Sequence, residues 1–171
     1  MKNTYIELNA KLCAFLDKTP NSFFAVNNIK EELAAQGFTE LQENSRWQLQ
    51  AGGKYYVSRN GSALLAFVIP QKDYLGFQVY ACHCDSPAFK LKNNAEIVVD
   101  ERYVKLNVEM YGGMLLNTWL DRPLSVAGRV LCNVDGRLEA RLVNIEQDLM
   151  MIPNLAIHMN REANEGVKLN A

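Results

Sequence analysis

The hydrophobic pattern of the chain changes from helical spacing to strand-like runs, and this change limits the folds open to it. Up to about residue 37, apolar residues recur three and four positions apart, as in Tyr5, Leu8 and Leu12, which is the spacing of one helix face. Further along, short apolar or β-branched runs alternate with turn residues, which is typical of strands. The pattern predicts an α/β fold in which early helices lie on a sheet.

Two helices are expected at the start of the chain. The first contains Tyr5 to Leu16 and ends before Pro20, because proline excludes the residue before it from helical conformation. The second begins near Ser22, a good N-cap residue, and ends near Gly37, a good C-cap residue.

Strands are expected over most of the remaining chain. The hairpin signal Asn60-Gly61 separates two of them, and the nearly all-apolar run 62–69 suits a strand covered on both faces. We predict strands at residues 47–50, 54–58, 63–69, 76–82, 97–99, 104–109, 124–134 and 138–145. No helical pattern interrupts the last four, so residues 93–171 are predicted to form a β-rich part, distinct from an α/β part at residues 1–92.

The composition excludes several classes of partner. The 171 residues contain 18 basic and 19 acidic ones, with a net charge of -1, so neither nucleic acid nor an anionic membrane is expected to bind. No apolar run approaches the ~20 residues of a membrane span, and the amino terminus does not resemble a secretory signal. Four cysteines without the spacing of a disulfide framework favour reduced thiols and a cytoplasmic location.

The segment from Cys82 to Pro87 carries the chemistry that the sequence shows most clearly. It follows a predicted strand, at the end where α/β sheets place their ligands. Because side chains alternate along a strand, His83 and Asp85 are expected on one face, and Cys82 and Cys84 on the other. A neutral imidazole binds a metal ion through one ring nitrogen while a carboxylate accepts the other N–H. This spacing therefore predicts half of a metal site.

The motif alone leaves other interpretations open. A structural histidine near a loop gives the same pattern, and for an isolated match that interpretation is favoured. Cys82 and Cys84 do not have Cys-x-x-Cys spacing and have no second cysteine pair, so core packing explains them better than zinc or redox chemistry. His158, taken alone, is best explained as a partly buried structural residue.

A series of motifs resembles the aspartyl aminopeptidase family, whose members are dinuclear-metal exopeptidases. The chain matches the amino-terminal part of that family, nearly from end to end. The matching stretches are Thr19-Pro20-Asn21-Ser22-Phe23-Phe24-Ala25-Val26, Gly53-Lys54-Tyr55-Tyr56-Val57-Ser58-Arg59-Asn60, Ala81-Cys82-His83-Cys84-Asp85-Ser86-Pro87, Glu109-Met110-Tyr111-Gly112-Gly113, Thr118-Trp119-Leu120-Asp121-Arg122-Pro123-Leu124, Ala127-Gly128-Arg129-Val130 and Ile152-Pro153-Asn154-Leu155-Ala156-Ile157-His158.

The resemblance implies a role for three residues. His83 would ligate a metal ion, Asp85 would hold and tune that histidine as part of the catalytic machinery, and His158 would contact substrate in a neighbouring subunit's active site. It also implies zinc or a similar divalent ion, two ions in the complete site, and removal of amino-terminal residues, preferably acidic ones, from peptides. Residues 1–92 would then belong to a peptidase domain, and residues 93–171 to part of an inserted dimerisation domain of a dodecamer.

The chain departs from the family's pattern in two ways, and these departures keep two rival functions open. Cys84 stands where relatives carry a small hydroxyl residue, and the family's remaining ligands would lie beyond Ala171. We therefore expect the 171 residues alone to be inactive. The rivals are a non-catalytic β-rich module for interaction or oligomerisation, and another co-catalytic metallohydrolase with a different specificity.

Overall fold

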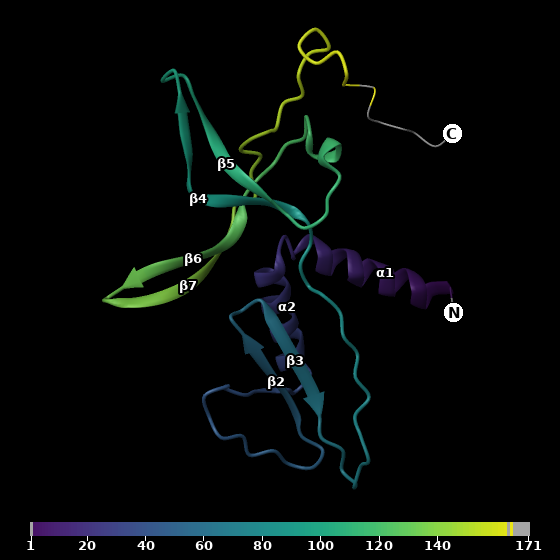
Figure 1. Cartoon of the computed structure of the whole chain (residues 1–171). Coiled ribbons are helices and arrows are strands. Elements are labelled where there is room, and N and C mark those ends of the chain that lie inside the picture. Colours follow the sequence, from purple (N-terminus) through teal and green to yellow (C-terminus); the bar gives the residue numbers. More distant parts are fainter. Residues whose placement is uncertain (1, 164, 166–171) are drawn as a thin grey trace. The chain divides into compact units, whose positions relative to one another are not determined.

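A computed structural model describes residues 2–163 and 165 of the chain, and Figure 1 shows its elements. In chain order these are α1 (Lys2–Asp17), α2 (Ser22–Ala35), β1 (Thr39–Glu40), β2 (Lys54–Arg59), β3 (Ala63–Val68), β4 (Ala88–Val99), β5 (Tyr103–Tyr111), the 3-10 helix η1 (Leu116–Trp119), β6 (Ala127–Val134) and β7 (Arg137–Asn144).

The chain divides into two compact units. The first consists of Met1–Ser86 with Ala127–Asn144, and the second of Pro87–Val126 with Ile145–Ala171. The division into domains at residue 93 stays a prediction.

Helix α2 has a well-defined cap at each end. The Asn21 side chain accepts hydrogen bonds from the backbone N–H groups of Phe23 and Phe24, at 3.0 and 3.3 Å. At the other end, Gly37 has a φ of 79°, and two backbone bonds, Gly37 to Ala34 and Phe38 to Leu33, both 3.0 Å, close a Schellman motif. The N-cap is thus Asn21 and not the predicted Ser22, because it is the Asn21 side chain that accepts from the N–H groups left free at the helix start.

Strand β2 lies at the centre of the first unit. It pairs with β1 in parallel and with β3 in antiparallel orientation. Tyr55 and Tyr56 are both buried, although successive side chains of a strand point to opposite faces. The loop before β2 closes the Tyr55 face, where Gln50 N–H donates to the Tyr55 hydroxyl at 3.0 Å. Helix α2, with Ala25 and Val26 buried, packs against β2 and β3. The strand covered on both faces is therefore β2. The sequence had predicted such cover for residues 62–69, which contain β3.

Two predicted strands are absent from the described residues. Residues 47–50 form a loop, because Thr39–Glu40 already occupies the edge beside β2. Residues 76–82 are extended but unpaired, with Phe77, Val79 and Tyr80 exposed by 63%, 75% and 85%. A strand needs a hydrogen-bonded neighbour, and no described residue supplies one to this segment. The strands predicted at residues 54–58, 63–69 and those beyond residue 93 are confirmed within a few residues, β4 being much longer than expected.

The two predicted helices are present but differ in how they pack. Apolar residues of α1, including Tyr5, Leu8 and Leu12, are exposed by 66%, 62% and 55%. Among the described residues, α2 is the helix that covers the sheet.

The second unit is built on the β4–β5 hairpin. Its register shifts between Leu91 and Glu96, which marks a bulge. The Phe89 ring meets Trp119 of η1 edge to face, with 5.2 Å between ring centroids. Two isolated bridges join the segment before β6 to the segment after β7. They pair Leu120 with Ile152 and Leu124 with Met150.

Strands β6 and β7 form a hairpin that belongs to the first unit. Its two-residue turn, Asp135-Gly136, has positive φ at both positions, 49° and 81°, as a type I′ turn requires.

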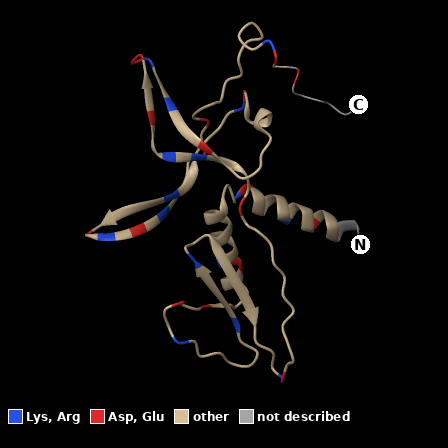
Figure 2. Cartoon of the chain, in the orientation of Figure 1, with Lys and Arg blue, Asp and Glu red and all other residues tan. Residues whose placement is uncertain are grey.

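Charged residues are scattered over the elements without a basic stripe, as Figure 2 shows. Neither described helix combines the length and the apolar character needed to cross a bilayer.

The caps of α2 give a stability test that separates two adjacent residues. We expect Asn21→Ala to lower the free energy of unfolding by about 1 kcal/mol, because it removes the acceptor for two N–H groups. Ser22→Ala, the matched control, should change it by less than about 0.5 kcal/mol. Urea denaturation followed by circular dichroism measures both. A larger loss from Ser22→Ala would show that the cap is misassigned.

Candidate active site

The segment that carries His83 and Asp85 starts at the end of β3 and runs back toward the β2–β3 turn. It starts after β3 at Ile69, whose backbone still bonds to Gly52 and Gly53. By Cys84 it has come back to the β2–β3 turn, where the Cys84 thiol donates to the carbonyl oxygen of Ser62 at 3.4 Å. The motif therefore lies at the turn end of the hairpin, on extended backbone that no described strand pairs with.

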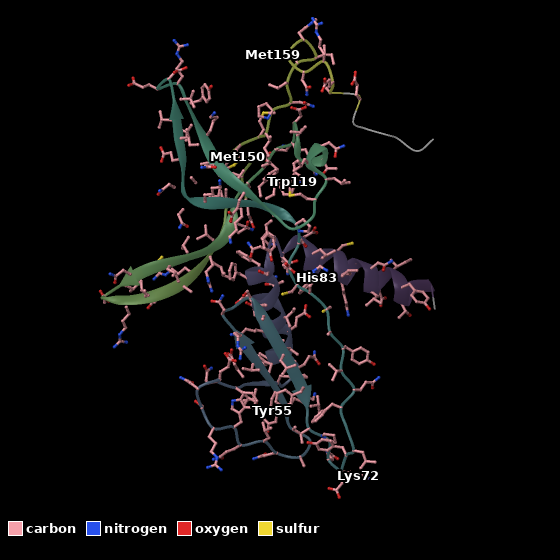
Figure 3. All side chains as sticks on the ribbon, viewed as in Figure 1. Tyr55, Lys72, His83, Trp119, Met150 and Met159 are labelled. Carbon is pink, nitrogen blue, oxygen red and sulfur yellow. The ribbon has the colours of Figure 1, made fainter. Side chains whose placement is uncertain are left out.

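His83 and Asp85 contact each other directly. The ring atom Nδ1 of His83 lies 2.9 Å from the backbone carbonyl oxygen of Asp85 and 3.2 Å from its carboxylate atom Oδ1. The His83 side chain is 82% exposed and that of Asp85 is 42% exposed. Figure 3 shows His83 on this extended segment. The pair is thus accessible from solvent and is not packed into the apolar core.

This geometry determines which ring nitrogen of the neutral imidazole can bind a metal ion. Both groups beside Nδ1 are oxygen acceptors, so Nδ1 must carry the proton and donate. The lone pair then lies on Nε2. A carboxylate that holds the second nitrogen in this way also raises the basicity of the ligand. His83 therefore has the tautomer that suits metal binding through Nε2.

The two cysteines of the motif differ in environment. Cys84 is partly buried and faces the hairpin, whereas Cys82 is exposed. All four cysteines are free thiols. The contact between His83 and Asp85, with Cys84 turned to the hairpin, follows the alternation expected of an extended segment.

The described residues fit part of a zinc site. A catalytic zinc ion takes three protein ligands, and no group of three His, Cys, Asp or Glu side chains able to hold a metal occurs in the part of the chain that the structure describes. Positions 1, 164 and 166–171 contain none of these residue types. Among the described residues, the candidate donor is therefore the His83 imidazole with the Asp85 carboxylate beside it.

His158 lies in the second unit, in a turn. Backbone N–H groups of Met159 and Asn160 donate to the carbonyl oxygen of Ala156, at 2.8 and 3.1 Å. The His158 side chain is exposed, whereas its apolar surroundings in the sequence suggested partial burial. The preceding segment is anchored by Asp121, whose carboxylate accepts from the Asn154 N–H at 2.8 Å.

A hollow on the β2–β3 hairpin has chemistry different from that of the His83 segment. It measures about 360 Å³ and is lined in part by Trp47 and by the ion pair of Glu43 and Arg59. The Arg59 atom Nε donates to Glu43 at 2.9 Å, and this hydrogen bond lowers the pKa of the exposed Glu43 carboxyl below its ordinary value. The Glu43 and Arg59 charges are paired with each other, and neither His nor Cys lines the hollow. The His83 segment therefore remains the candidate site.

Reasoning from the sequence missed the guanidinium of Arg129, which lies beside the turn that Cys84 contacts. Arg129 of β6 donates from Nη1 to the backbone oxygen of Asn60 at 2.6 Å and to its side-chain oxygen at 3.0 Å. The two residues are 69 positions apart, so no local pattern reveals the contact. A hairpin of the first unit thereby touches the same turn that Cys84 touches.

Curated proteins with similar sequences are described as probable aminopeptidases. Residues 15–171 match the model of the family described as aminopeptidase I zinc metalloprotease (M18). A probable M18 family aminopeptidase 2 of Clostridium novyi is 47% identical over 174 residues, which cover 99% of this chain and 40% of the relative. The chain thus spans about 40% of the length of the curated relatives that it matches.

Solved structures agree with this similarity. A chain in the cryo-EM structure of the Ape4 and Nbr1 complex superposes with a TM-score of 0.85 at 38% identity, covering 92% of this chain and 31% of that one. The S. cerevisiae mApe1 dodecamer gives a TM-score of 0.77 at 29% identity, covering 91% of this chain and 37% of that one. The predicted α/β fold class, with two helices and sheets, is confirmed. The chain belongs to the M18 family of aminopeptidase I zinc metalloproteases.

Proposed function

We propose that this chain supplies one metal-binding half-site of an M18 aminopeptidase, with His83 as the metal ligand. The observation that carries the proposal is the contact between His83 Nδ1 and the two oxygen acceptors of Asp85, at 2.9 and 3.2 Å. It directs the Nε2 lone pair outward on a ring that is 82% exposed. A structural histidine in a packed loop would instead be buried among its partners.

Asp85 and His83 would have different roles in metal binding. Asp85 keeps the Nδ1 proton in place and thereby holds the ring in one tautomer. His83 offers Nε2 to a divalent ion, zinc being the metal named for the family. A zinc ion bound there would supply Lewis-acid chemistry for peptide-bond hydrolysis. The complete site would hold two ions, and its further ligands would come from residues other than those described.

The resemblance to aspartyl aminopeptidases supports a finer assignment. In it, the substrate is a peptide with an acidic amino-terminal residue. A cytoplasmic location is proposed separately, because free cysteines favour a reducing compartment. His158 would reach the substrate of a neighbouring subunit, which its exposed position in a turn allows. The solved dodecamer of the S. cerevisiae relative supports a homo-oligomer of the same kind, with residues 93–171 contributing to dimerisation.

A non-catalytic module for interaction or oligomerisation is the second candidate. The observation in its favour is that the described residues bring together one imidazole and one carboxylate, and no larger ligand group. Metal binding at His83 separates the two candidates, because a module without catalysis has no need of a tuned imidazole.

The two histidines provide a matched test of the metal site. We expect zinc to shift the ring signals of His83 in the NMR spectrum of the 171-residue chain, and His83→Ala to abolish specific binding. Asp85→Asn should weaken binding by about 10- to 100-fold, as is typical when a carboxylate behind a histidine ligand is lost. His158→Ala is the control and should leave the zinc affinity unchanged. Zinc shifts at His158 in place of His83 would contradict the assignment.

Hydrolysis tests the enzymatic part of the proposal. Because a two-metal hydrolase needs more ligands than one imidazole, the 171-residue chain alone should not release aspartate from an aspartyl chromogenic peptide. A fusion with the remaining portion of the Clostridium novyi relative should do so with zinc, and His83→Ala in the fusion should remove the activity. Zinc-dependent turnover by the 171 residues alone would refute the half-site. Preference of the fusion for leucyl over aspartyl substrates would refute the acidic specificity and leave the aminopeptidase assignment intact.

A further inference from the structure

The turn between β2 and β3 accepts hydrogen bonds from two distant parts of the first unit. Asn60 and Gly61 have positive φ angles of 54° and 65°, and Ser62 N–H donates back to Arg59 at 3.2 Å. The backbone carbonyl oxygens of Asn60 and Ser62 lie in this turn. Each becomes an acceptor for a side chain from outside the hairpin.

Arg129 occupies the first of these acceptors. Its Nη1 donates to both oxygens of Asn60, at 2.6 and 3.0 Å. The same guanidinium lies over the Phe23 ring of α2, 4.4 Å from the ring centroid, within the range of a cation–π interaction. Arg129 therefore connects β6, α2 and the turn at a single point.

Cys84 occupies the second acceptor. Its thiol donates to the carbonyl oxygen of Ser62 at 3.4 Å. Cys84 stands between His83 and Asp85, and in an extended segment neighbouring side chains point to opposite sides. A thiol held against the hairpin therefore turns the His83–Asp85 pair away from it.

We propose that Arg129 is a positioning residue for the metal site, acting through the turn and Cys84. On the proposed function, which this inference presupposes, Arg129 fixes the turn, the turn holds Cys84, and Cys84 sets the direction of the His83 ring. The guanidinium suits this task because its planar donor group binds two oxygens and stacks on a ring at the same time. A thiol is a weak hydrogen-bond donor, so a turn left free to move would hold Cys84 poorly.

A simpler alternative is that Arg129 stabilises the fold without affecting His83. The tautomer of His83 separates the two, because a stabilising contact elsewhere in the unit leaves the proton of Nδ1 in place. Ring nitrogen shifts, measured by long-range 1H–15N NMR at a pH where the imidazole is neutral, report the tautomer without any metal.

The experiment compares two arginines of the same hairpin in the 171-residue chain. We expect Arg129→Gln to shift the His83 nitrogen signals toward an average of the two tautomers. It should also weaken zinc binding by about tenfold, the lower end of the range for residues that support a ligand. Arg129→Lys, which keeps a cationic donor over Phe23, should restore part of the effect. Arg141→Gln should change neither quantity, because Arg141 pairs with Glu139 on β7 and not with the turn.

The connection through Cys84 is tested separately. Cys84→Ala removes the donor and should reproduce the effect of Arg129→Gln on the tautomer, whereas Cys84→Ser keeps a donor and should not. The inference is overturned if Arg129→Gln lowers the unfolding midpoint but leaves the tautomer and the zinc affinity at their original values. If zinc fails to perturb His83 in the unmodified chain, the proposed function fails, while the tautomer measurement still decides the role of Arg129.

Discussion

The double pairing of β2 is the constraint on which the first unit depends. Strand β2 pairs with β3 along its whole length and with β1 at Tyr55 and Tyr56, and it buries these two side chains on opposite faces. The β2–β3 register then fixes where the turn at residues 60–62 falls. Because Cys84 and Arg129 both bond to that turn, the direction of the candidate metal ligand is set by a strand that contributes no ligand itself.

The chemistry of the site arises from much shorter contacts. His83 meets Asp85 two positions along the chain, so the acceptors that decide the tautomer of the imidazole belong to the same short extended segment, which the Cys84 contact connects to the turn. A metal site, in contrast, needs ligands from several segments. This difference explains how the chain presents a candidate ligand beside a carboxylate while the described residues contain no group of three such side chains. The His83–Asp85 contact joins near neighbours in the sequence, whereas a complete metal site would join distant ones.

The sequence predicted what depends on near neighbours and missed what depends on distant ones. Asn60-Gly61 predicted its hairpin because positive φ at both positions is a property of the turn alone. Residues 76–82 have the alternation of a strand, but pairing requires a partner, and no described segment provides it. The N-cap moved from Ser22 to Asn21 because both residue types cap well and only the entry geometry of the chain decides between them. Arg129 and Asn60, 69 positions apart, share no pattern that a single sequence reveals.

The exposed apolar residues of the extended segment also show the difference between local pattern and distant pairing. Phe77, Val79 and Tyr80 are among its exposed side chains, and their alternation is that of a strand with a neighbour. Within the described residues this segment has no neighbouring strand, and the chain spans about 40% of the length of the curated relatives that it matches. The His83 motif at the end of this segment keeps its local geometry because the Ser62 carbonyl holds Cys84. On the inference above, contacts to the turn thus maintain the direction of the candidate ligand on a stretch of backbone that, within the described residues, has no strand beside it.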